Sequence, residues 1–152
     1  MKAKRIICTY IEPKQATKRA RKAPVASEHA EQKALCDFWR LYSKSKGLDE
    51  RLLFAIPNAA KRSYKLAAYL KAEGLRAGCP DMFLAMPKFV RGCQPQELMF
   101  AGLFLELKRK GAAKPPKTQL EFADMLRRQG YNVVICQGGA DEAIRAIRAY
   151  LA

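Results

Sequence analysis

The stretch Gly102-Leu-Phe-Leu-Glu-Leu-Lys108 decides the predicted fold. It reads as a β-strand, because apolar residues recur at every second position and side chains alternate between the two faces of a strand. Its three leucines would face the core, and Phe104, Glu106 and Lys108 would share the opposite face. Buried charges cost several kcal/mol unless they are paired or bound to metal. A carboxylate and a lysine on one face of so apolar a strand therefore indicate a functional site.

A second apolar run, residues 81–86, opens with Asp81 directly after Pro80, 25 residues before Glu106. If the two strands pair, Asp81 and Glu106 can share a divalent cation with Lys108 beside them. That arrangement suits hydrolysis of a phosphodiester. The alternative is that the three side chains form only a structural ion-pair group, since an Asp near a strand start is common by itself.

Length and composition limit the class of protein. A chain of 152 residues with 49% apolar residues predicts one globular domain with a sizeable core. No apolar run approaches the roughly 20 residues that cross a membrane. The formal net charge of +15 favours a polyanionic partner such as nucleic acid. A ribosomal-type protein or a binder of anionic membranes would also carry such a charge.

The five cysteines and the single histidine exclude two other classes of site. The cysteines are widely spaced without a CxxC pair, so a structural zinc site is not expected, nor is a mechanism that needs two histidines. Reduced thiols and the lack of a secretory signal predict a cytoplasmic protein. Cys36 and Cys136 fall at apolar positions and are expected to be small core residues.

Charge divides the chain into two parts. Residues 1–25 carry eight Lys or Arg against one acid, which gives +7 of the +15, and they include two prolines. This stretch is predicted to be a basic N-terminal arm that contacts phosphates, or else a solubilising tail that contacts nothing. Residues 26–152 form the predicted folded domain.

Hydrophobic periodicity and turn residues predict eight elements in the order α, β, α, β, β, α, β, α. Ser27 is the expected N-cap of the first helix, and Thr118 with Glu121 matches a capping box at the start of the third. Residues 87–101 are predicted to contain a variable turn. The elements are expected at 27 to 42 or 44, 51–56, 63–73, 81–86, 102–108, 118–129, 131–136 and 141–151.

Pro80-Asp81 followed by Glu106-Leu-Lys108, within this order of elements, resembles the PD-(D/E)xK nuclease superfamily. More narrowly, the chain is similar to the virus-type replication-repair nuclease (VRR-Nuc) family, in the compact stand-alone form that phages and prophages carry. The resemblance implies an α/β, restriction-endonuclease-like core with a mixed central sheet flanked by helices. Cys79 departs from the Val that the family usually has there. The matching stretches over 27–151 also include Ser27-Glu28, Gln32, Pro57-Asn58, Gly74, Gly78, Lys117 to Gln119 and Gly130-Tyr131.

Roles for the site residues follow from the chemistry and from the resemblance. Asp81 and Glu106 are expected to bind Mg²⁺ or Mn²⁺, because hard cations prefer carboxylate oxygens. The resemblance adds the main-chain carbonyl of Leu107 as a ligand. Lys108 is expected to orient or help deprotonate the attacking water, or to stabilise charge on the phosphate. By resemblance, Gln119 contacts Lys108 or the phosphate; otherwise it is a polar residue of a first helical turn.

The acid of the first helix has two candidates. Glu28 and Glu31 lie one turn apart, and both border the expected buried face, so periodicity does not separate them. The resemblance favours Glu28 as a catalytic residue, because an acid four residues before Gln32 matches the family pattern.

A DNA-binding face is expected around the site, although each basic residue could equally be a solvated surface charge. Lys- and Pro-rich segments can follow a DNA backbone without reading bases, and no recognition helix is visible. Structure-selective binding is therefore favoured over sequence-specific binding. Asn58 could also simply form a turn. The candidates are Asn58, Lys61, Arg62, Lys65, Arg76, Lys110, Lys114 and Lys117.

Together these features predict a Mg²⁺-dependent endonuclease for branched DNA, with a role in DNA repair, in the cytoplasm of a bacterial host if a phage or prophage encodes it. A symmetric homodimer would suit four-way (Holliday) junctions, because paired nicks need two-fold symmetry, and a monomer would suit flaps. The compact form lacks domains that could grip a flap, which favours the dimer. The alternatives are a non-catalytic basic nucleic-acid-binding protein and a sequence-specific restriction-type enzyme.

Overall fold

The structure, a computed structural model, describes residues 26–57, 64–90, 92 and 97–152. The predicted basic arm, residues 1–25, lies outside the described residues. Across the described ranges, none of the helices has both the length and the apolar character needed to cross a bilayer.

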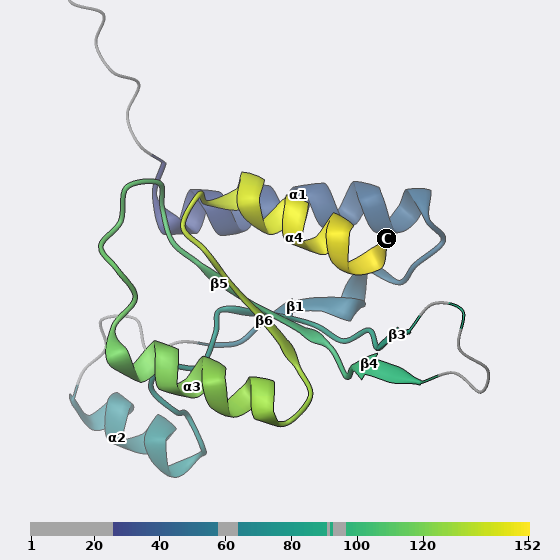
Figure 1. Cartoon of the computed structure of the whole chain (residues 1–152). Helices are drawn as coiled ribbons and strands as arrows, with labels where there is room; N and C mark the ends of the chain where they lie inside the picture. Colours follow the sequence, from purple (N-terminus) through teal and green to yellow (C-terminus); the bar gives the residue numbers. More distant parts are fainter. Residues whose placement is uncertain (1–25, 58–63, 91, 93–96) are drawn as a thin grey trace, which may run out of the picture.

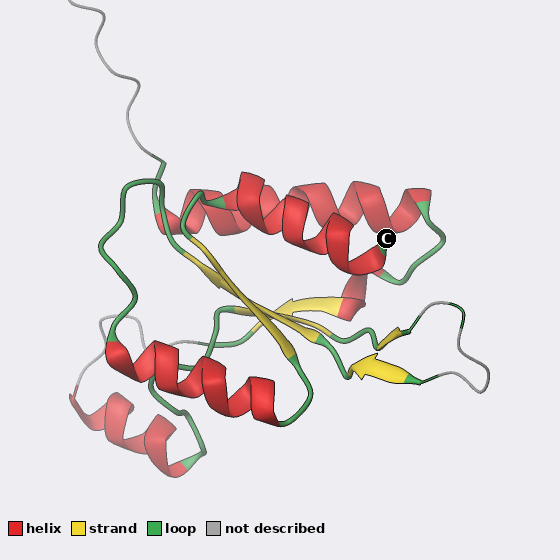
Figure 2. Ribbon diagram, viewed as in Figure 1, coloured by secondary structure: helices red, strands yellow, loops and turns green. Residues whose placement is uncertain are grey.

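A mixed four-stranded sheet forms the centre of the molecule (Figures 1 and 2). Its strands are β1 (Leu53–Ala55), β2 (Met82–Leu84), β5 (Leu103–Leu107) and β6 (Asn132–Cys136), in the order β1-β2-β5-β6. β2 pairs antiparallel with both β1 and β5, whereas β5 and β6 are parallel. The predicted pairing of the Asp81 strand with the Glu106 strand, and the mixed sheet, are confirmed.

Helices cover both faces of this sheet (Figure 1). α1 (Glu28–Ser45) and α4 (Ala140–Leu151) pack on each other, and both contact β5. α3 (Lys117–Arg128) lies on the opposite face against β6, with α2 (Tyr64–Ala72) below it in the view. α3 is the crossover that parallel strands require, since β5 and β6 cannot be joined by a tight turn.

The alternation in β5 places its residues in two separate cores. Its three leucines are at most 3% exposed and pack with Leu35 and Trp39 of α1. Phe104 points the other way and packs with Ala123 and Leu126 of α3. Apolar residues on both faces explain why β5 reads as a nearly continuous hydrophobic run, and why a charge within it needs partners.

The cysteines among the described residues, Cys36, Cys79 and Cys136, are free thiols. Cys136 is fully buried, and burial raises the pKa of its thiol to about 12. Cys36 is partly buried against the main core, and burial also raises the pKa of its thiol. Both were predicted as small core residues, and their burial confirms this.

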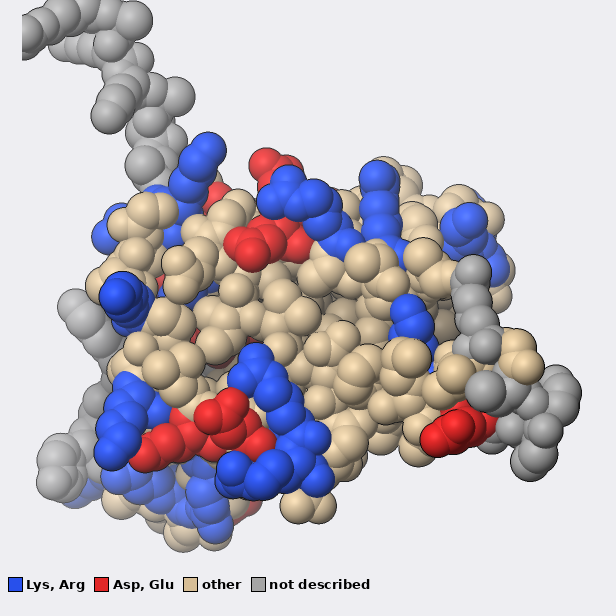
Figure 3. Space-filling view, viewed as in Figure 1, with Lys and Arg blue, Asp and Glu red and all other residues tan. Residues whose placement is uncertain are grey.

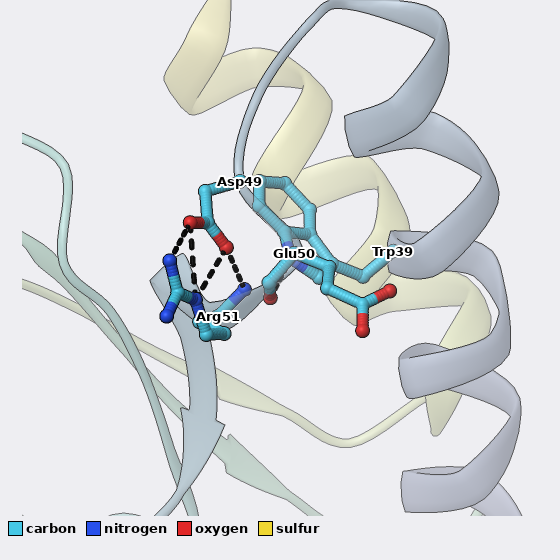
Figure 4. Close-up of polar contacts among 4 residues, drawn as sticks. All are labelled: Trp39, Asp49, Glu50 and Arg51. Atoms are coloured by element: carbon cyan, nitrogen blue, oxygen red, sulfur yellow. Dashed lines mark hydrogen bonds and ion pairs between the residues drawn. The ribbon is translucent and has the colours of Figure 1, made fainter.

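The predicted strand 51–56 was too long at its start. A short 3-10 helix, η1 (Glu50–Leu52), precedes β1, and the Asp49 carboxylate caps it by accepting from the Arg51 N–H at 2.9 Å (Figure 4). The Arg51 guanidinium also pairs with this carboxylate. Trp39 Nε1 donates to the Glu50 carbonyl at 2.7 Å, which fastens this turn to α1. The apolar run of residues 52–56 did not reveal these local hydrogen bonds.

Two further elements differ from the prediction. A hairpin of β3 (Lys88–Phe89) and β4 (Leu98–Phe100) occupies the expected variable turn; both strands are too short to leave a periodic signal. The capping box of α3 is wrong, because the N-cap is Pro116, two residues before Thr118, and no side chain caps the helix. Glu121 consequently pairs with Lys117 at 3.4 Å on the helix surface.

Candidate active site

The predicted catalytic side chains meet at one end of the sheet. Figure 1 shows the C-terminal end of β5 at the same end of the molecule as the N-termini of α1, α3 and α4. A cavity of about 340 Å³ opens there. Its lining contains all five residues predicted as catalytic, and consists of Glu28, Lys71, Leu75, Arg76, Ala77, Gly78, Cys79, Asp81, Glu106, Lys108 and Gln119.

Strand register brings the two predicted metal-binding carboxylates together. Met82 pairs with Leu105, so the next position along the ladder sets Asp81 opposite Glu106. Asp81 Oδ2 accepts a hydrogen bond from the Leu107 N–H at 2.9 Å. In a strand, the N–H and C=O of one residue point to the same edge, so the Leu107 carbonyl also faces the Asp81 side. The Asp81 carboxylate and this carbonyl therefore lie on the β2 side of β5, next to the residue that carries the Glu106 carboxylate.

Glu106 is the most deeply buried charged residue in the described chain. Its side chain is only 4% exposed, and Oε1 accepts from Lys108 Nζ and from Gln119 Nε2, both at 2.6 Å. Oε2 is fully buried and has no hydrogen-bond partner among the described residues. Burial raises the pKa of Glu106, the Lys108 ammonium opposes that rise, and the Asp81 and Glu28 carboxylates add to it.

The structure separates the two acids of α1. Glu28 lines the cavity, and its negative charge contributes to the raised pKa of Glu106. Glu31 is absent from the cavity lining, and its Oε2 instead accepts the Ala140 N–H at the start of α4, at 2.7 Å. The position of Glu28 agrees with the resemblance. The first turn of α1 is itself fixed as predicted, because Ser27 Oγ accepts from the Ala30 N–H at 3.2 Å.

Gly78 lets the loop before Asp81 approach α3. Its φ is +87°, and a Cβ built on it would lie 2.5 Å from the Thr118 carbonyl oxygen. Only glycine tolerates both that backbone conformation and so close a contact. The loop that leads to Asp81 is therefore packed on the first turn of α3, which carries Gln119. This packing holds α3 over the face of β5 that carries Phe104 and Glu106, so Gln119 reaches Glu106 on that face.

The oxygen atoms at the site suit a hard divalent cation that takes few ligands from the protein. Among the described residues, no group of three or more His, Cys, Asp or Glu side chains is arranged to hold an ion. Mg²⁺ does not need such a cage, because it keeps several waters and often takes only one or two carboxylates. The buried Glu106 Oε2 lacks a hydrogen-bond donor, and a cation would satisfy it. Asp81, Glu106 and the Leu107 carbonyl fit this role.

The predicted DNA-binding residues are only partly gathered around the cavity. Arg76 lines it, although its guanidinium also donates to the Lys71 and Leu75 carbonyls. The other described candidates, Lys65, Lys110, Lys114 and Lys117, are exposed outside the lining. Figure 3 shows Lys and Arg side chains over both helical layers at this end of the molecule. Asn58, Lys61 and Arg62 lie outside the described residues.

Lys71 is a lining residue that the sequence reasoning missed. It belongs to the last turn of α2, where a lysine is ordinarily explained by the helix dipole. Its spacing from Gly74 and Asp81 carried no distinguishing signal. Only the path of the loop from α2 to Asp81 brings it to the cavity.

Comparisons with known proteins identify the family of the chain. A family model described as the VRR-NUC domain matches residues 16–140 and so begins inside the stretch assigned to the basic arm. One similar solved structure, described as a VRR_NUC domain protein, has a TM-score of 0.66 and 25% identity. The similarity covers 85% of this chain and 91% of that one. No curated protein matches the chain. The chain belongs to the VRR-NUC domain family, a family of nucleases.

Proposed function

We propose that the protein is a Mg²⁺-dependent endonuclease that hydrolyses phosphodiester bonds in branched DNA. The observation that carries this proposal is the Glu106 carboxylate. It is buried opposite Asp81, holds Lys108 and Gln119 on one oxygen, and has its other oxygen without a hydrogen-bond partner in the described chain. A buried acceptor beside a second carboxylate is stabilised best by a cation.

Asp81, Glu106 and the Leu107 carbonyl would hold Mg²⁺, and Mn²⁺ should substitute for it. The bound ion would polarise the scissile phosphate and favour the nucleophilic form of a nearby water. Glu28 faces the same cavity and would orient the cation or its waters. In this proposal the carboxylates hold the cation and do not contribute to DNA affinity.

Lys108 and Gln119 would act on the reacting groups directly. The 2.6 Å contact of Lys108 Nζ with Glu106 holds the ammonium at the cavity, where it can orient the attacking water or stabilise charge on the phosphate. Gln119 donates to the same oxygen from α3. A cation at Oε2 would leave both contacts at Oε1 intact, so the two side chains are prepositioned.

The basic residues around the cavity would bind DNA phosphates. Lys71 and Arg76 form one wall of it, and we add Lys71 to the predicted set. Lys65, Lys110, Lys114 and Lys117 would extend the grip across the exposed surface, and Asn58, Lys61 and Arg62 stay predictions. Contacts to phosphates position the duplex without reading sequence. This supports selection by DNA structure.

Four-way junctions are the favoured substrate and flaps the next. A symmetric homodimer would present two cavities and make paired nicks. The family match over residues 16–140 supports the nuclease activity on which this preference rests.

A non-catalytic nucleic-acid-binding protein is the second candidate. The 2.6 Å ion pair between Lys108 and Glu106 is compatible with this candidate, because an ion pair with a purely structural role would have the same geometry. A purely structural role, however, gives no reason for Glu28, Asp81 and Glu106 to line one cavity or for Glu106 Oε2 to stay without a donor. Repulsion between carboxylates destabilises a fold unless a cation offsets it.

A cleavage panel tests the proposal. Linear, flap, splayed and four-way DNA of matched sequence would be incubated with the full chain and Mg²⁺, Mn²⁺ or EDTA. Metal-dependent cuts on branched DNA, with paired nicks on the junction, are expected. Binding of every substrate without cleavage in either metal would favour the non-catalytic candidate, and equal cleavage of linear DNA would remove the preference for branched substrates.

A further inference from the structure

The turn between β6 and α4 connects three parts of the molecule through consecutive backbone N–H groups. Gly138 donates to Glu142 Oε2 at 2.6 Å, within the turn and its own helix. Gly139 donates to the carbonyl of Lys108 at 3.0 Å. Ala140 donates to Glu31 Oε2, on α1, at 2.7 Å. Adjacent amides thus join the end of the catalytic strand to the first turns of α1.

We propose that Glu31 is a positioning residue of the active site. Its carboxylate holds α1 to the turn that binds the Lys108 backbone, and this sets Glu28, one helical turn away, against Glu106. The inference rests on the proposed nuclease function and deepens it. It separates the two acids by role: Glu28 faces the cavity, and Glu31 acts through the position of its neighbours.

The geometry of Gly139 supports this role. Its φ is +70°, and a Cβ there would collide with the Glu31 carboxylate. A residue larger than glycine would push Glu31 off the Ala140 N–H. The turn therefore packs closely around the Glu31 carboxylate. A carboxylate that lay free on the surface would not require glycine at position 139.

Both helix starts depend on this contact. Within the described chain, α4 has no side-chain cap from its own N-cap, Gly139, so Glu31 serves one of the N–H groups that helix starts leave without an intrahelical partner. The start of α1 is also held by the exposed Ser27 cap and by Gln32, whose Nε2 donates to Met82 Sδ at 3.3 Å. Helix ends fray easily. Loss of the Glu31 contact would free the turn that carries Glu28.

The contact needs an acceptor oxygen more than a charge. Glu31→Gln keeps an amide oxygen at the same reach and should retain the tie, whereas Glu31→Ala removes it. Asp141→Ala is the matched control. Like Glu31→Ala, it removes one negative charge near the start of α4, but Asp141 is an exposed residue of the first turn of α4 itself. Gly139→Ala should break the same contact between Glu31 and Ala140, because the added Cβ would displace the Glu31 carboxylate.

The test measures Mn²⁺ binding by calorimetry on the full chain without DNA, and single-turnover cleavage of junction DNA well below the melting temperature. Glu31→Ala should weaken Mn²⁺ binding at least about fivefold and slow cleavage at least about tenfold. Glu31→Gln and Asp141→Ala should stay within about twofold of the natural chain. Gly139→Ala should resemble Glu31→Ala, and the double variant should be little worse than either, as expected for one shared contact.

Different failures point to different errors. If the natural chain binds Mn²⁺ and cleaves, but Glu31→Ala changes only the melting temperature, the contact is merely structural and the inference is wrong. Equal losses in Glu31→Gln and Glu31→Ala would also overturn it, because charge would then matter rather than the tie. A natural chain that neither binds Mn²⁺ nor cleaves would overturn the proposed function itself.

Discussion

Replacing Gly78 with Ala should damage both the stability and the activity of the protein. At φ +87° an L-residue costs roughly 1–2 kcal/mol. The added Cβ would also meet the Thr118 carbonyl at 2.5 Å, and that oxygen belongs to backbone that cannot rotate away. Overpacking of this kind costs about 1–3 kcal/mol more. Relief of the clash requires the loop before Asp81 and the first turn of α3 to separate, which would withdraw Gln119 from Glu106.

Gly130→Ala is the matched control. Gly130 has φ +83°, but a Cβ there would meet none of the described residues within 4 Å, so this variant carries the conformational strain alone. About 2 kcal/mol of extra loss in Gly78→Ala corresponds to a melting temperature roughly 4–8 °C below that of the control. Thermal unfolding followed by circular dichroism gives this difference, and cleavage measured well below both transitions should fall only in Gly78→Ala. If Gly78→Ala and Gly130→Ala had equal melting temperatures and equal activity, the packing of this loop on α3 would not be what assembles the site.

Three further predictions concern individual groups. Glu28→Gln should slow cleavage at least about tenfold, or roughly 1.4 kcal/mol of transition-state stabilisation, with Glu31→Gln near the natural rate; the opposite ranking in a single-turnover assay would exchange their roles. Because burial raises the pKa of Glu106 in the metal-free protein, Mg²⁺ binding should strengthen as pH rises and the carboxyl loses its proton; a Mg²⁺ affinity that does not change with pH in the mildly acidic range would contradict the assignment. Deleting residues 1–25 removes +7 of charge, so the log–log dependence of DNA affinity on salt should become shallower by about 0.9 for each lost phosphate contact; an unchanged slope means that the arm does not touch DNA.

The parts of the fold with strong periodicity could be predicted from sequence. Alternation in residues 102–108 indicated the central strand, and the pairing of its ladder with β2 follows from an apolar run that starts at Asp81. Apolar spacing in the first helix located the side chains that pack on the main core. These signals are strong because burial of one face repeats over many residues.

Elements governed by local hydrogen bonds could not be predicted in the same way. The β3–β4 hairpin is built from two very short strands, and η1 depends on the Asp49 cap and on Trp39 Nε1. The Thr118 capping box failed because the N-cap is Pro116, two residues earlier. A sequence pattern does not distinguish a residue that can cap from one that does.

The site was predicted as a set of chemical groups, but its assembly was not. Asp81, Glu106 and Lys108 follow from sequence, whereas the separation of Glu28 from Glu31 depends on where α4 begins. Lys71 joins the cavity only through the path of a loop whose Gly78 packs on α3. Such contacts join residues far apart in the chain, and periodicity contains no information about them.

The most direct test of the central claim compares Asp81→Ala and Glu106→Ala with the natural chain. Mg²⁺-dependent cleavage and DNA affinity would be measured on the same branched substrate, with melting curves as a check on folding. Each variant should lose cleavage and keep near-natural or slightly tighter DNA binding, because the carboxylates serve the cation and removal of an acid lessens repulsion of phosphates. Mg²⁺-dependent cleavage retained by folded Asp81→Ala would contradict the account.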